Sequence, residues 1–121
     1  MYQVLESDRI VMVDVDNTLI MWDTTGHRGQ TLTIEGPKGV LTVAPHGPNI
    51  RKIIEFWKVG YVIVVWSGTG AKWAEIVVQA LGLSEKVTLI LSKPLYYFDD
   101  QLPERWMGRR IYINLHTGKE E

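Results

Sequence analysis

Two acidic residues follow the first apolar run of the chain. Asp14 and Asp16 come directly after Ile10–Val13 and are separated by one residue. On an extended strand their side chains would point to opposite faces, so the chain must bend after Asp14 if both serve one site. Such a bend can aim a carboxylate and a main-chain carbonyl at one point, and oxygen ligands suit Mg²⁺. The alternative is a strand end with solvated aspartates, or an Asx turn at Asn17.

A hydroxyl residue follows the second apolar run. Ser67 comes after residues 61–66 and stands just before a predicted helix. Its hydroxyl, the Gly68 amide and the positive end of the helix dipole would favour a bound phosphate. Taken alone, the pattern favours a plain helix cap at Ser67 or Thr69 over a phosphate site. The glycine and lysine spacing of a nucleotide P-loop is absent.

Further charged residues lie late in the chain. Lys93, just before Pro94, could neutralise a phosphate and a nucleophilic carboxylate. Asp99 and Asp100 follow an aromatic run and could complete a cation site with the earlier aspartates. Each feature by itself is also explained as solvated surface.

The elements that must position these residues predict an α/β domain with a mainly parallel sheet. Unalternated apolar runs indicate strands buried on both faces, and helices are indicated by apolar residues at helical spacing. We expect strands at 10–13, 61–66 and 87–91, helices at 50–59 and 71–81, a hairpin within 24–44 and a last strand at 111–113. Ligands bind at the carboxyl ends of strands in such sheets, where Asp14 and Ser67 fall.

Composition excludes several classes of protein. The 121 residues make one domain, 1–121, and the absence of cysteine excludes disulfides and thiolate chemistry. A net charge of -1 argues against a strongly basic nucleic-acid surface. The sequence shows no membrane-spanning run and no signal peptide, so we expect a cytoplasmic protein without a membrane partner.

The order of these signals resembles the haloacid dehalogenase (HAD) superfamily, specifically its phosphatase branch. The matching pieces are Val11–Leu19, Val64–Gly68, Lys93-Pro94 and Phe98–Asp100, which together span nearly the whole chain. The first piece is the most specific and the lysine the least. The compact, cap-less form is similar to small HAD-like proteins of bacteriophages. The resemblance implies a Rossmann-like three-layer domain with a hairpin flap at 24–44 in place of a cap domain.

The resemblance also implies a Mg²⁺-dependent phosphatase. Asp14 would be the nucleophile that forms an aspartyl-phosphate, and Asp16 the general acid and base. Thr18 would fix the bend, while Ser67, Gly68 and Lys93 would hold the phosphoryl group. Mg²⁺ would bind the Asp14 carboxylate, the Asp16 carbonyl and the Asp99-Asp100 pair, with Asp100 favoured as the direct ligand.

The interval between Lys93 and Asp99 is short for this family. If residues 96–98 were a strand rising to Asp99, Lys93 would lie roughly 20 Å away at its opposite end. We therefore prefer a strand at 87–91 that ends beside Ser67. Residues 94–98 would then cross the rim and deliver Asp99 and Asp100 from a loop.

Access to the site has to be open, because the chain leaves no room for a cap domain. An open site suits a phosphorylated small molecule, a nucleic-acid end or a phosphoprotein, or a partner subunit acting as lid. The 24–44 hairpin could be a contact in a homo-oligomer, and His27, Arg28 and Lys38 on it could meet substrate. Trp22 and Trp106 are free to border the site.

Two other functions compete with the phosphatase. A non-catalytic descendant could keep the fold for binding only, although it retains both Asp14 and Asp16. A phospho-receiver signalling domain needs an aspartate at the end of a middle strand, where this chain has Ser67.

Overall fold

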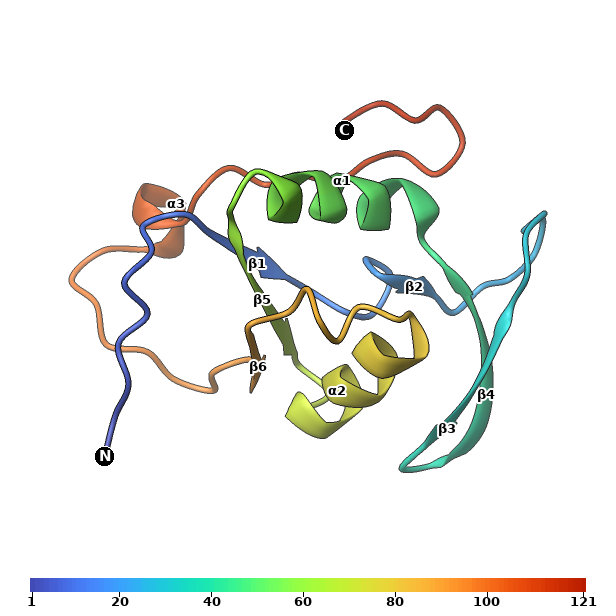
Figure 1. Ribbon diagram of the computed structural model, residues 1–121, viewed down its shortest axis with the longest axis horizontal. Coiled ribbons are helices and arrows are strands. Elements are labelled where there is room, and N and C mark those ends of the chain that lie inside the picture. The colour runs from blue at the N-terminus through green and yellow to red at the C-terminus, as the bar shows by residue number, and fades with distance from the viewer.

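A parallel sheet of three strands forms the centre of the protein (Figure 1). The structure, a computed structural model, describes residues 1–121. Strands β1 (Ile10–Val13), β5 (Val62–Ser67) and β6 (Leu89–Ser92) run in the order β1-β5-β6. They are mostly β-branched or otherwise apolar, which favours extended backbone in a sheet. The three expected strands are confirmed, although β6 begins at Leu89 rather than at residue 87.

Both long helices pack on one face of this sheet. Helix α1 (Gly47–Lys58) connects β1 to β5 by way of the hairpin, and α2 (Ala71–Ala80) connects β5 to β6. The two crossovers advance in the same direction across the sheet, and right-handed crossovers then put both helices on one side. One buried cluster joins sheet residues to residues of α2, and Ile53 and Ile54 of α1 pack against it. The molecule thus has one helix layer where the three-layer expectation required two.

The opposite face of the parallel sheet is only partly covered. Ile10 and Met12 of β1 and Leu89 and Leu91 of β6 are exposed on it. They alternate with neighbours that face the helices, as the two-residue period of a strand requires. Val64, at the centre of this face, is buried.

A second, antiparallel sheet carries the flap. Strands β2 (Ile20–Met21), β4 (Gly39–Pro45) and β3 (Leu32–Gly36) lie in the order β2-β4-β3. Gly39, at φ 115°, closes the tight β3–β4 turn in a conformation that side chains disfavour. A Cβ on Gly36 would lie 3.0 Å from the Trp73 ring, so glycine lets the hairpin approach α2. The hairpin expected within 24–44 is confirmed.

After β6 the chain leaves the sheet in an exposed projection. Residues 94–102 run outward to the short helix α3 (Pro103–Trp106), which has no buried residue. Figure 1 shows this loop on the side of the sheet away from the hairpin. The strand expected at 111–113 does not join the parallel sheet, and Ile113 forms only an isolated antiparallel bridge with Glu120.

The buried face should dominate stability. Val65→Ala removes two methyl groups from a β5 side chain that is 1% exposed, and we expect a loss of about 2 kcal/mol in the free energy of unfolding. Val40→Ala, at an exposed position on β4, is the matched control and should cost under about 0.5 kcal/mol. Urea denaturation measures both. Equal losses would contradict the described core.

Candidate functional site

Asp14 lies just beyond the carboxyl end of β1 and makes two side-chain contacts. Lys93 Nζ lies 3.0 Å from its Oδ1 atom, and Thr18 Oγ1 donates a hydrogen bond of 3.0 Å to Oδ2. The Asp14 and Lys93 side chains remain 36% and 41% exposed. An oriented carboxylate paired with a cation therefore faces solvent at the edge of the sheet.

The sheet explains how Lys93 reaches Asp14. Strand β5 pairs in parallel with both β1 and β6, so the carboxyl ends of all three strands meet at one edge. The Lys93 amide continues the β6 ladder and donates to the Ser67 carbonyl at 2.9 Å. Lys93 Nζ also lies 5.9 Å from the centre of the Trp66 ring, within range of a cation–π attraction. The expected position of Lys93, just after this strand and beside Ser67, is confirmed.

The chain bends directly after Asp14, as the sequence predicts. The amides of Thr18, Leu19 and Ile20 all donate to the Val15 carbonyl, at 3.2, 2.9 and 3.4 Å. Asn17 adopts φ 59°, a left-handed conformation that asparagine tolerates better than most residues. This tight turn places Asp16 on the side of the flap and α2.

Three donors hold the Asp16 carboxylate. Its Oδ1 atom accepts from the indole nitrogens of Trp22 at 3.2 Å and Trp73 at 3.0 Å, and its Oδ2 atom accepts from Thr69 Oγ1 at 2.9 Å. The two indole rings stack with centroids 5.8 Å apart. Asp16 therefore ties the start of the flap to α2, and Trp22 borders the site as the sequence suggested.

Ser67 is the last residue of β5, and Gly68 begins the turn between β5 and α2. Ser67 is 1% exposed, and its Oγ atom accepts from the Thr69 amide at 3.0 Å, a hydrogen bond within the turn before α2 and not the helix cap considered as the alternative. Gly68 is exposed, and its amide donates to no acceptor within the protein. The first amide of α2, that of Ala71, is capped instead by Ser92 Oγ at 2.9 Å. Gly68 is thus the accessible anion donor at this turn.

Two residues that the sequence analysis missed support the bend from behind. Asn49, buried in the first turn of α1, donates to the Thr18 carbonyl at 3.0 Å and accepts from the Ile113 amide at 2.8 Å. Tyr112 donates its hydroxyl to the Asn17 carbonyl at 3.1 Å. Asn49 stands between Pro48 and the helix expected at 50–59, and nothing in the sequence indicated the partners of Asn49 or Tyr112.

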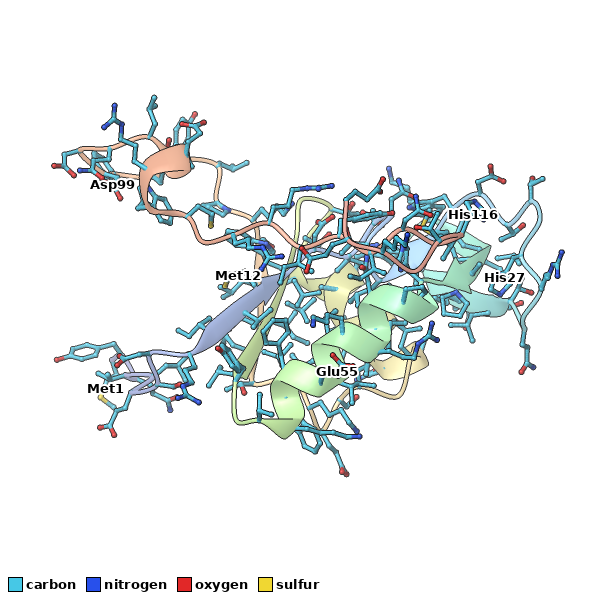
Figure 2. All side chains as sticks on the ribbon, turned by 90° about the horizontal axis from the view of Figure 1, so that it is seen from above. Met1, Met12, His27, Glu55, Asp99 and His116 are labelled. Carbon is cyan, nitrogen blue, oxygen red and sulfur yellow. The ribbon has the colours of Figure 1, made fainter.

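Asp99 and Asp100 do not join this site. Figure 2 shows Asp99 at the far end of the projection, and Asp99 Oδ1 accepts only from the nearby Gln101 amide at 2.9 Å. No group of three or more acidic or histidine side chains in the chain could hold a metal ion. Of the residues that the resemblance assigned to Mg²⁺, only Asp14 and Asp16 therefore lie at this edge of the sheet, and the full ligand set that it implied is not assembled.

A polar groove of about 630 Å³ lies between the flap and the C-terminal segment. His27, Arg28 and His116 line it, whereas Lys38 does not, and Figure 2 shows both histidines on this side. The residues that line the groove do not include Asp14, Asp16, Ser67, Gly68 or Lys93. The groove is therefore separate from the Asp14 site. None of the helices has the length and apolar character that crossing a membrane requires.

Buried His46 should make stability depend on pH. It caps α1, with Nδ1 accepting from the Asn49 amide at 3.1 Å, while its buried Nε2 atom has no partner. Burial lowers the pKa of His46 below its ordinary value of 6.5, and the charge of Arg51 lowers it further. The unfolded chain therefore takes up a proton first as the pH falls through 6.5, so His46 should reduce stability below that pH.

The comparison variant is His46→Asn, because asparagine is also a good helix cap. When the pH is lowered from 7.5 to 5.5, the free energy of unfolding should fall more for the natural protein than for His46→Asn. An equal fall in both proteins would contradict the lowered pKa.

Comparisons with known proteins identify no relative of this chain. No protein-family model, no curated protein and no solved structure matches the chain.

Proposed function

We propose that this protein is a phosphomonoesterase of the HAD type that works through Asp14. The observation that carries the proposal is the exposed Asp14 carboxylate, held at 3.0 Å by both Lys93 and Thr18 at the carboxyl edge of a parallel sheet. Phosphoryl transfer depends mainly on positioning and on neutralising charge. A fixed carboxylate beside an accessible cation and an exposed amide provides both.

In the first proposed step, one Asp14 oxygen attacks the phosphorus of a phosphomonoester. The bond from phosphorus to the leaving oxygen breaks, and an aspartyl-phosphate forms. Lys93 offsets the repulsion between the two anions, and the Gly68 amide donates to a phosphoryl oxygen. Thr18 keeps the attacking carboxylate in a single orientation.

Asp16 is the general acid and the general base in this proposal. It protonates the leaving oxygen in the first step and takes a proton from the attacking water in the second, which returns Asp14 and releases phosphate. Its Oδ1 atom is occupied by two indoles, whereas Oδ2 has only the exposed Thr69 hydroxyl as partner. Oδ2 is therefore the atom that we assign to proton transfer, with Thr69 moving aside.

We propose Mg²⁺ as the cofactor, held by the Asp14 carboxylate, the Asp16 carbonyl, the substrate phosphate and water. A bound cation of this kind offsets the charge of the transferring phosphoryl group. With only one protein carboxylate in the set, we expect weak binding in the absence of substrate.

A second candidate function is phosphate-group binding without turnover. The engagement of Asp16 by three donors and the remote position of Asp99 and Asp100 favour it, because both limit catalysis. Turnover separates the two functions. A phospho-receiver domain is disfavoured. It needs an aspartate at the end of its middle strand, and the central strand β5 ends in buried Ser67 instead.

Replacing the nucleophile should abolish hydrolysis. We expect Mg²⁺-dependent hydrolysis of an aryl phosphate, and a loss of at least about 10³-fold in kcat for Asp14→Asn. Asp8→Asn, at an exposed aspartate outside the site, is the control and should keep full activity. EDTA should stop turnover and added Mg²⁺ should restore it. Turnover that survives in Asp14→Asn would contradict the proposed mechanism.

Lys93 should matter to the same reaction. Lys93→Met removes the cation beside Asp14, and we expect kcat/KM to fall by about 10² to 10³-fold while the circular dichroism spectrum is unchanged. Lys72→Met, at a lysine whose side chain is 81% exposed on α2, is the matched control. If kcat/KM fell as much in Lys72→Met as in Lys93→Met, the role assigned to Lys93 would be contradicted.

A further inference from the structure

We propose that a second copy of this chain binds along the edge of β6 and the adjoining apolar arm, which we define as residues 94–107. The pairing has a two-fold axis, so each copy presents the same surface to the other. This inference does not depend on the proposed enzymatic function.

The apolar arm exposes large side chains that nothing in the chain covers. Leu95, Tyr96 and Phe98 are 91%, 88% and 104% exposed. Tyr97, Leu102, Trp106 and Met107 are also exposed. A contiguous apolar surface of this size on a small domain typically marks an interaction site.

The exposed area is about what a stable dimer needs. Aromatic side chains bury about 150 to 250 Å² each, so the four aromatic residues of the arm offer roughly 600 Å². A specific interface buries about 800 Å² on each partner. The exposed leucines and methionine of the arm, with Leu89 and Leu91 of β6, supply the remainder.

The neighbouring strand offers its main chain as well. β6 is an edge of the parallel sheet, and none of its four residues is charged or proline. The main-chain groups along such an edge can pair with a strand of another chain. Two β6 edges related by a two-fold axis would run antiparallel and would join the two sheets into one.

The charges of this region are complementary to themselves. Three acidic residues come first along the chain and three basic residues follow them. The acidic ones are Asp99, Asp100 and Glu104, and the basic ones are Arg105, Arg109 and Arg110. Of these six, only Arg109 has an ion-pair partner within the chain, namely Glu120. Two copies of the segment that run antiparallel place the acidic half of each against the basic half of the other. This complementarity identifies a second copy as the partner.

The test is the mass in solution of the full chain. Sedimentation equilibrium over a range of concentrations should show reversible association to twice the 13.8 kDa of one chain. Phe98→Glu should raise the dissociation constant by about thirtyfold or more, because aromatic residues at the centre of an interface carry much of its affinity. The fully exposed Phe98 makes this variant safe for folding.

Val40→Glu is the matched control, because it puts the same charge on an exposed valine of the 24–44 hairpin. It should leave association unchanged, whereas Arg105→Glu should weaken it and high salt should weaken the natural dimer. A natural protein that stays monomeric at every concentration would overturn the proposal. So would dissociation by Val40→Glu together with none by Phe98→Glu, which would place the contact on the hairpin.

Discussion

The parallel pairing of β5 with both of its neighbours is the constraint on which the candidate site depends. Val13 lies opposite Val65, and Ser67 lies opposite Ser92, so residues far apart in the chain end at one edge of the sheet. Lys93 can then pair with Asp14. The Trp66 ring and the hydrogen bond from the Lys93 amide to the Ser67 carbonyl hold the lysine in place. If β6 slipped by one residue, the Lys93 side chain would turn to the other face and the ion pair would be lost.

Local pattern predicted the elements near this edge and the residues that meet there. The apolar run before Asp14, the bend after it and the strand that ends near Lys93 are each encoded in adjacent residues. Their contacts follow once parallel strands share an edge. Trp22 was also accessible to sequence reasoning, because it follows the first motif closely, whereas Trp106, named with it, lies on the exposed helix α3.

The rest depended on long-range packing that local pattern does not contain. The number of layers follows from the direction of two crossovers, which periodicity cannot reveal. The bond from Asn49 to Thr18 joins residues from different elements. Asp99 and Asp100 follow an aromatic run that looks like a strand, yet the residues from Leu95 to Phe98 are exposed and nothing anchors them to the sheet. Their expected place at the metal rested on residue type and on the resemblance, and neither fixes where the loop after β6 runs.

The central claim is that Asp14 carries the phosphoryl group during turnover, and trapping that species tests it most directly. The protein would be mixed with an aryl phosphate and Mg²⁺, quenched in acid within one turnover, and analysed by intact mass and peptide mapping. We predict the addition of one phosphoryl group to the peptide that contains Asp14, labile at alkaline pH as an acyl phosphate is. Hydrolysis that proceeds with no such adduct, or with the phosphoryl group on another residue, would contradict the account.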